Sequence, residues 1–462
     1  MTIATELAAK ITATTFDDLG PRALHYARMG LLDTLGVGIA GAQEDAAVIA
    51  RKIAGAATGP ATVWGTDCRT EILDAAFLNG IAANVLDFDD CTDNLGGHPS
   101  APVLPALLAL GEKLQAGGRA VLTAYVVGFE TETQLGRGVN FHHYEKGWHP
   151  TATLGVFGAG AACAKLLGLD ANRTAHTLAL CASMAAGVKS NLGSMAKPMH
   201  IGQSSRNGLL AALLAAEGFT GNADAVEHPQ GFLELFNGRG TYSIERILAK
   251  WGQPWDIEMP GISIKQYPCC LSMQGTADLM LQLVSEHDIR PDDVMQVRAR
   301  IAARRLEHTN RPQPKSALDA KLSMHYVLAR ALINRSVSLE HFDGDNYKAP
   351  DVQRVMKLVD ATPFEAGLAA PEFGAEITLV TRDGREVSGT IERPVGHTPG
   401  EPLAYAKLAA KFTACARRVL TARQVDEILA KLADCENLAD IRALTELVAP
   451  ARQPSRAAAA AR

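Results

Sequence analysis

The stretch ISIKQYPCC, residues 262–270, lies where the pattern of the sequence changes. Before it, apolar residues recur at helical spacing in long segments rich in Ala and Gly. After it, MQVRARIA at 295–302 alternates with period two, and EITLVTRDGREVSGTIE at 376–392 carries a hairpin turn at Asp383-Gly384. The ISIKQYP part itself predicts a strand. The sequence therefore predicts a mainly α protein, with a large all-helical domain and a smaller α+β domain.

Short loops with Gly, Pro, Asp or Asn separate the predicted helices. These helices cover residues 21–40, 72–86, 102–114, 119–135, 151–169, 172–188, 202–218, 243–251, 272–286, 319–334, 402–420, 421–435 and 438–448. We predict a helical domain over 1–264, an α+β lid domain over 265–393, C-terminal helices over 394–450 that return to the helical domain, and a disordered tail over 451–462.

Composition excludes several classes of protein. The chain has 462 residues, a net charge of −5 and 5% aromatic residues, which disfavours nucleic-acid binding. Eight cysteines without a CxxC pair are too few for a disulfide scaffold and favour a reducing compartment. No apolar run reaches the ~18 residues that a membrane span needs, and the N-terminus lacks a secretory signal. We expect a cytoplasmic protein with neither a nucleic-acid nor a membrane partner.

The densest polar cluster is DFDDCTDNLGGH, residues 87–98, directly after a predicted helix. One interpretation is a general acid/base, His98, that a nearby Asp orients. The plain alternative is a solvated acidic turn. Residues 89–93 also match DDxxD, the magnesium–diphosphate motif of helical isoprenoid synthases, but no convincing second metal motif accompanies it.

Three further segments offer cations. His149 precedes Pro150 at a predicted helix start, where anions are favoured, although a surface loop is the plainer interpretation. Lys197 in GSMAKPMHIG is a candidate carboxylate clamp or an ordinary surface lysine. Lys265 lies at the predicted domain boundary, where ligand sites are common, or at a strand edge. Tyr326, in a predicted helix, is best explained by core packing.

The phrases NVLDFDD, GHPSAPVLPALLALGE, GWHPTATLGVFGA, KPMHIG and KQYPCC occur together in this order. In this the chain resembles the MmgE/PrpD family, which includes 2-methylcitrate dehydratase, cis-aconitate decarboxylase and iminodisuccinate epimerase. The resemblance implies a helical domain plus an α+β lid with the site in the cleft between them, a homodimer, and no metal or organic cofactor.

The resemblance also implies the roles of the site residues. His98 would transfer a proton at a substrate carbon and Asp87 would orient or charge a neighbour, while Tyr326 would donate a hydrogen bond or assist proton transfer. His149, Lys197 and Lys265 would bind substrate carboxylates. Two positions depart from the family pattern near the expected site and are further substrate-binding candidates: Cys91, where some members have Thr or Ser, and Gln274, where many have His.

The implied substrate is a small di- or tricarboxylate. Proton transfer next to a carboxylate builds negative charge, which fixed cations stabilise. The same intermediate serves dehydration, epimerisation and, after loss of CO₂, decarboxylation. Our default expectation is a cofactor-free lyase like 2-methylcitrate dehydratase. The alternatives are an epimerase of the iminodisuccinate type, a decarboxylase of the cis-aconitate type, and a non-catalytic carboxylate-binding dimer.

Overall fold

The computed structural model describes residues 1–54, 58–365, 371–399 and 402–451. These divide into two compact units. Unit 1 holds residues 1–85, 89–262 and 405–462, and unit 2 holds residues 86–88 and 263–404, apart from the undescribed positions. The predicted tail from residue 452 onward lies outside the described residues. The fold class is mainly α, with a helical unit and a smaller α+β unit, as the sequence predicts.

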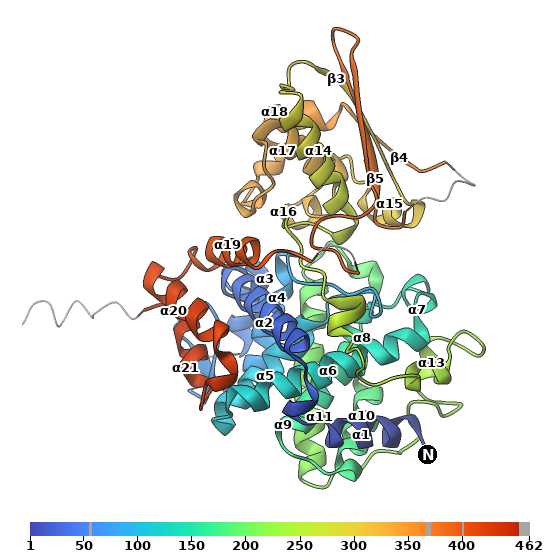
Figure 1. Cartoon of the computed structure of the whole chain (residues 1–462), viewed down its shortest axis with the longest axis vertical. Helices are drawn as coiled ribbons and strands as arrows, with labels where there is room; N and C mark the ends of the chain where they lie inside the picture. Colours follow the sequence, from blue (N-terminus) through green and yellow to red (C-terminus); the bar gives the residue numbers. More distant parts are fainter. Residues whose placement is uncertain (55–57, 366–370, 400–401, 452–462) are drawn as a thin grey trace, which may run out of the picture. The chain divides into compact units, whose positions relative to one another are not determined.

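Unit 1 is built from helices and one short two-stranded ladder (Figure 1). The helices are α1 (Ile3–Ala13), α2 (Pro21–Gly41), α3 (Asp45–Ala54), α4 (Ile72–Val85), α5 (Ser100–Leu114), α6 (Gly118–Val139), α7 (His142–Glu145), α8 (Pro150–Thr153), α9 (Gly155–Leu166), α10 (Ala171–Met184), α11 (Ala196–Ala216), α12 (Phe232–Phe236), α13 (Ile244–Leu248), α19 (Tyr405–Ala416), α20 (Ala422–Ala433) and α21 (Arg442–Thr445). The strands are β1 (Ala61–Thr62) and β2 (Arg69–Thr70), which pair antiparallel.

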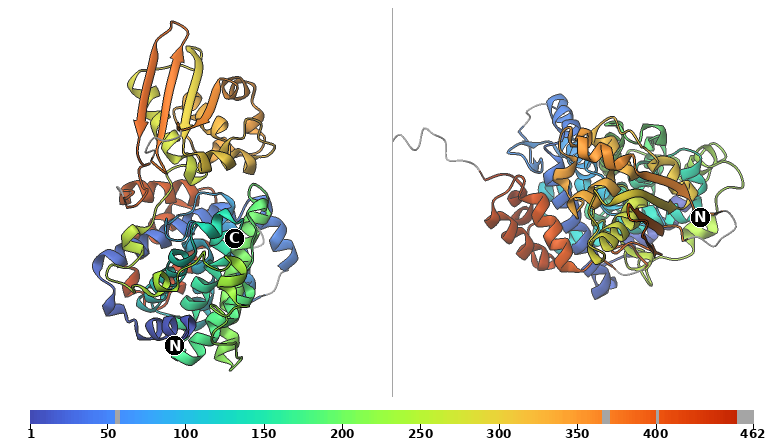
Figure 2. Two further views of the ribbon diagram at one scale, coloured as in Figure 1. Left: turned by 90° about the vertical axis from the view of Figure 1, so that its right-hand side faces the viewer. Right: turned by 90° about the horizontal axis from the view of Figure 1, so that it is seen from above.

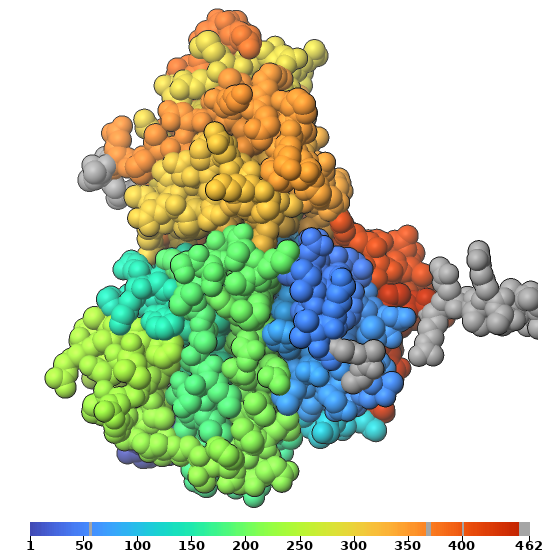
Figure 3. All heavy atoms as spheres, turned by 180° about the vertical axis from the view of Figure 1, so that it is seen from behind, coloured from blue at the N-terminus to red at the C-terminus, as the bar shows by residue number. Residues whose placement is uncertain are grey.

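Small residues let the central helices of unit 1 approach closely. Gly80 on α4 faces Gly202 on α11, and a Cβ at position 202 would lie 2.3 Å from the carbonyl oxygen of Phe77. The surfaces of α3 and α11 adjoin on the face drawn in Figure 3. This close packing fixes the ends of α4 and α5, between which the acidic segment runs.

Unit 2 contains one four-stranded sheet and, among the described residues, five α-helices, and the left view of Figure 2 shows its strands. The strands are β3 (Val294–Ile301), β4 (Val359–Pro363), β5 (Ala375–Thr381) and β6 (Glu386–Ile391), and the helices are α14 (Gln274–Glu286), α15 (Ala303–Thr309), α16 (Ala317–Ala320), α17 (Met324–Asn334) and α18 (Pro350–Met356). The strand order is β4-β3-β5-β6, parallel between β3 and β4 and antiparallel elsewhere. The predicted hairpin is confirmed, and Gly384 adopts φ +85° in its turn.

The apolar sides of the sheet and of its helices form the core of unit 2. Met280 and Val284 on α14 are buried in one cluster with Val327 on α17 and with Val297 and Leu379 on β3 and β5. Among the described helices of both units, none has the length and apolar character that crossing a bilayer requires.

Three local predictions are corrected by the structure. Residues 262–268 form no continuous strand: Ser263 makes an isolated bridge and the N–H of Ile264 bonds to the carbonyl oxygen of Gly396, but the N–H groups of Gln266 and Tyr267 bond to a side chain, as described below. The predicted helix over 151–169 is split at Leu154 into α8 and α9. Helix α11 starts six residues earlier than predicted, at Ala196, because Pro198 lies in the first turn, where its missing N–H is not needed.

Candidate active site

His98 lies in unit 1, just before α5, and two oxygen atoms lie against Nδ1 of its imidazole. Its Nδ1 is 3.1 Å from Oδ2 of Asp89 and 3.0 Å from the carbonyl oxygen of Asp90. The Sγ of Cys91 is 3.6 Å from the same nitrogen. Because both oxygens accept hydrogen bonds, the arrangement favours a proton on Nδ1, which leaves Nε2 as the nitrogen with the lone pair. His98 therefore has the geometry of a general acid/base.

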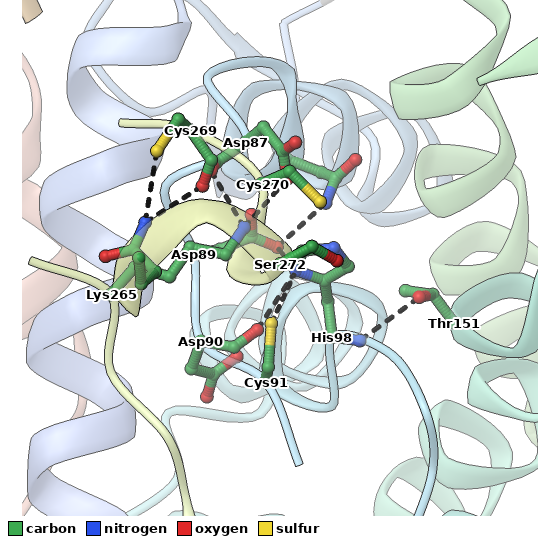
Figure 4. Close-up of polar contacts among 12 residues, drawn as sticks. Asp87, Asp89, Asp90, Cys91, His98, Thr151, Lys265, Cys269, Cys270 and Ser272 are labelled. Atoms are coloured by element: carbon green, nitrogen blue, oxygen red, sulfur yellow. Dashed lines mark hydrogen bonds and ion pairs between the residues drawn. The ribbon is translucent and has the colours of Figure 1, made fainter. Parts of the chain in front are cut away.

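The segment that carries His98 is fixed on several sides. The backbone N–H of His98 donates to Oγ1 of Thr151 at 3.1 Å, as Figure 4 shows. The hydroxyl of Thr92 donates to the carbonyl oxygen of Gly261 at 2.9 Å, and the amide of Asn94 donates to Asp256 at 2.9 Å. These bonds order a loop that would otherwise be a solvated acidic turn.

Asp90 lies beneath His98 in a buried network of hydroxyl groups. Its Oδ1 accepts the backbone N–H of Ser100 at 3.3 Å, its Oδ2 bonds to the Ser100 hydroxyl, and that hydroxyl bonds to the Tyr125 hydroxyl. Burial raises the pKa of Asp90 well above its usual range, and the charge of Asp33 adds to the effect. Burial thus disfavours a charge on Asp90, and Asp89, which contacts Nδ1 of His98 directly, is the carboxylate placed to stabilise an imidazolium there.

Asp87 and Lys265 form a buried ion pair in unit 2. The Lys265 ammonium donates to Oδ1 and to the carbonyl oxygen of Asp87, both at 2.8 Å (Figure 4). Lys265 is only 1% exposed. A buried ammonium is stable only when paired, so Asp87 holds this cation in place. Asp87 thus charges and positions a neighbouring lysine, and its backbone adopts φ +51° to do so.

Gln274, at the start of α14, holds the loop that follows Lys265. Its Oε1 accepts the backbone N–H groups of Gln266 and Tyr267 at 3.0 and 3.1 Å. Its Nε2 donates to the carbonyl oxygens of Tyr267 and Cys269 at 2.9 and 3.1 Å. These bonds replace the ladder of the predicted strand. They favour a role of Gln274 in positioning the loop, and its predicted contact with substrate stays a prediction.

His149 and Lys197 lie in unit 1 near a histidine that the sequence analysis did not select. His149 precedes α8, and its Nδ1 is 3.4 Å from Nδ1 of His200 on α11. Lys197 lies in the first turn of α11 and is only 6% exposed. Burial, aided by the charge of Lys197, lowers the pKa of His200. A small pocket of about 250 Å³ adjoins His200 and is lined by His200, Gln203, Ser204 and apolar residues.

Tyr326 is fully buried in the core of unit 2. Its hydroxyl donates to the carbonyl oxygen of His341 and accepts a hydrogen bond from Nε of Arg330 at 3.0 Å. Burial raises its pKa. This environment matches the core-packing interpretation. The role in proton transfer that the resemblance implies stays a prediction, and the geometry does not favour it.

Two residues of the site were not identified from the sequence. Asp89 is one of several adjacent acids, and only the folded loop shows that it, within unit 1, faces His98. His200 follows Lys197 by three positions, and this spacing places both side chains on one side of a helix. That spacing is the signal in the sequence that could have identified His200 as a neighbour of Lys197. Asp89 and Asp90 are the first two acids of the DDxxD match. In the structure Asp89 contacts His98, and Asp90 contacts Ser100.

Comparison with protein-family models and comparison with individual known proteins both find similarity over most of the chain. The family model described as the MmgE/PrpD N-terminal domain matches residues 5–245, and the MmgE/PrpD C-terminal domain matches residues 267–434. The chain is 30% identical over 450 residues to the cis-aconitate decarboxylase of Homo sapiens, covering 93% of this chain and 91% of the relative. The cis-aconitate decarboxylase of Mus musculus is 30% identical over 438 residues, covering 90% and 87%. That of Aspergillus terreus (strain NIH 2624 / FGSC A1156) is 28% identical, covering 82% of each.

Proposed function

The chain belongs to the MmgE/PrpD family and is a lyase of that family, and on this premise we propose that it decarboxylates cis-aconitate or a closely similar unsaturated tricarboxylate. The predicted family is confirmed. The similarity to relatives named cis-aconitate decarboxylases, over 82–93% of this chain, favours this alternative over the default expectation of 2-methylcitrate dehydration.

The observation that carries the chemistry is the orientation of His98 by Asp89. In the proposed reaction the bond from a substrate carbon to the leaving carboxylate breaks, its electron pair moves into the adjacent unsaturated system, and CO₂ leaves. The resulting carbanion-like species takes a proton from Nε2 of the His98 imidazolium. The Asp89 carboxylate, 3.1 Å from Nδ1, stabilises that imidazolium until it gives up the proton.

We assign the remaining substrate carboxylates to the cations of unit 1. Lys265 is buried against Asp87, and its contact with a substrate carboxylate stays a prediction. Lys197 lies in the first turn of α11, where the helix dipole disfavours a cation, so a bound carboxylate would stabilise it. His149 and His200 supply further donors beside it. Fixed cations of this kind stabilise the negative charge that develops during the reaction. The predicted absence of a metal or organic cofactor and the predicted homodimer stay predictions.

The test is to incubate the protein separately with cis-aconitate, 2-methylcitrate and iminodisuccinate in D₂O and to follow each by NMR. We expect CO₂ release from cis-aconitate, with one deuterium in the product at the protonated carbon. Loss of water from 2-methylcitrate would instead support the dehydratase. Deuterium exchange in iminodisuccinate without loss of any group would support the epimerase. No change in any of the three would overturn the proposal.

Three variants test the predicted roles of His98 and Lys265. His98→Gln keeps a polar side chain of similar size but cannot transfer the proton, so we expect kcat to fall about 10²–10⁴-fold while substrate still binds. Lys265→Arg keeps the charge and the bond to Asp87, and we expect it to retain more activity than Lys265→Met. Full activity in His98→Gln would remove His98 from the mechanism.

A further inference from the structure

A second group of reactive side chains lies in unit 2, where the segment after Lys265 meets α15. Cys270 and Ser272 lie just before α14, and His308 lies in α15. The Sγ of Cys270 is 3.6 Å from Nε2 of His308, and the Oγ of Ser272 is 3.1 Å from the same nitrogen. Figure 4 shows Cys270 and Ser272 in this region. A thiol within hydrogen-bond distance of an imidazole is the arrangement that activates a nucleophilic cysteine.

The neighbouring thiol provides a natural contrast. Cys269 is fully buried, and burial raises its pKa far above the ordinary value. Burial also raises the pKa of Cys270, but the hydrogen bond and the charge of His308 outweigh it, so the pKa falls to about 7. Among the other charges that act on this thiol, Asp87 raises its pKa and Lys265 lowers it. Two adjacent cysteines thus differ sharply in their content of thiolate.

Access and support complete the geometry. Cys270 is half-buried, so part of its surface is reachable, unlike that of Cys269. Its backbone N–H donates to the carbonyl oxygen of Lys321 at 3.0 Å, which fixes the position of the thiol. The carbonyl oxygen of His308 accepts a hydrogen bond from Nε of Arg311 at 3.0 Å, which helps to fix α15 at that point. The proposed decarboxylation uses none of these three side chains, Cys270, Ser272 or His308.

We propose that Cys270, activated by His308, is a covalent modification site of this protein for activated alkenes, that is, alkenes conjugated to a carbonyl or carboxyl group. The thiolate Sγ forms a bond to the β-carbon of the alkene. The π electron pair moves to the α-carbon, which takes the proton from the His308 imidazolium. The product is a thioether with neutral His308, and no group leaves. A thiol whose pKa lies near the ambient pH reacts fastest in such additions.

The test uses N-ethylmaleimide as the probe on the whole purified protein, with limited reagent, timed quenching and tandem mass spectrometry. Fragment ions that separate residues 269 and 270 identify the modified thiol. We expect Cys270 to be modified at least about tenfold faster than Cys269. The Cys269→Ser variant should keep this modification and the Cys270→Ser variant should lose it. Equal or faster modification of Cys269 would overturn the proposal.

Two measurements isolate the part played by His308. At pH 7 a thiol of pKa about 7 is half ionised, whereas an ordinary thiol is ionised by roughly a few per cent. The rate at Cys270 should therefore fall about tenfold or more in His308→Gln, and an unchanged rate would refute the assignment. Should that variant not fold, the pH profile of the unmodified protein decides. Its midpoint should lie near 7, and a midpoint of 8.5 or above would refute it. Both readouts are independent of decarboxylase activity.

Discussion

The substitution Asp89→Asn tests the central feature of the site, because it removes one charge and little else. Oδ2 of Asp89 accepts from both His98, at 3.1 Å, and the amide of Asn84, at 2.8 Å. In the variant, the carboxamide oxygen is expected to take this position, because the amide nitrogen there would face two donors. The orientation of the His98 ring and the proton on Nδ1 are therefore kept, and only the negative charge is lost.

The size of the effect follows from the distance. Two unit charges 3.1 Å apart interact by about 5 kcal/mol at an effective dielectric of about 20. This is an upper bound, because solvent and neighbouring groups compensate part of the lost charge. Since a charged His98 is needed to protonate the substrate, we expect kcat to fall by about 10²–10⁴-fold with a small change in KM. Time-resolved NMR of cis-aconitate consumption measures both constants.

A matched variant in the same loop serves as the control. Asp93→Asn also removes one negative charge from this segment. Asp93 follows Asp89 by four residues and is partly exposed, whereas Asp89 is buried. We expect it to keep activity within a few-fold. If Asp89→Asn retained activity within threefold of the original protein while both variants showed the same circular dichroism and melting temperature, the proposed role of Asp89 would be refuted.

Three further predictions concern stability and binding. Lys411→Met should destabilise unit 1 by about 3–5 kcal/mol in urea denaturation, because it removes the ammonium that lies 2.6 Å from the buried Asp33 carboxylate. The double variant Lys411→Met/Asp33→Asn should recover most of the lost stability. Burial and the charge of Asp256 raise the pKa of Glu130 from 4.5 to about 7, so the folded protein holds a proton that the unfolded chain releases. The free energy of unfolding should therefore fall by about 3 kcal/mol as pH rises from 4.5 to 7, and Glu130→Gln should flatten this profile; a flat profile in the original protein would contradict it. His200→Ala should raise KM for cis-aconitate about tenfold with little change in kcat, and an unchanged KM would remove His200 from substrate binding.

The sequence predicted most of the elements, because their patterns are local. The alternation at 295–302 and the Asp383-Gly384 turn are sufficient to define β3 and the hairpin of β5 and β6. The error at 262–268 arose because apolar alternation is necessary but not sufficient for a strand. The decisive partner there is the Gln274 side chain, eight residues beyond Gln266, and no periodicity reveals it.

The site was predictable in residue types but not in pairings. Several acids precede His98, and spacing alone does not distinguish the one that lies 3.1 Å from its ring from the one that binds Lys265. That choice is made by the backbone between Asp87 and Asp89, including the positive φ of Asp87. Likewise, the burial of Tyr326 follows from the packing of α17 in unit 2, which the helix pattern of its own segment does not specify.

The path of the backbone limits how this protein can be divided. Residues 86–88 group with unit 2 although Val85 and Asp89 group with unit 1. A fragment covering only residues 263–404 would therefore contain the Lys265 ammonium but lack its counter-ion, the Asp87 carboxylate. Truncation to the smaller unit, or its exchange between relatives as one continuous segment, would therefore also have to include residues 86–88.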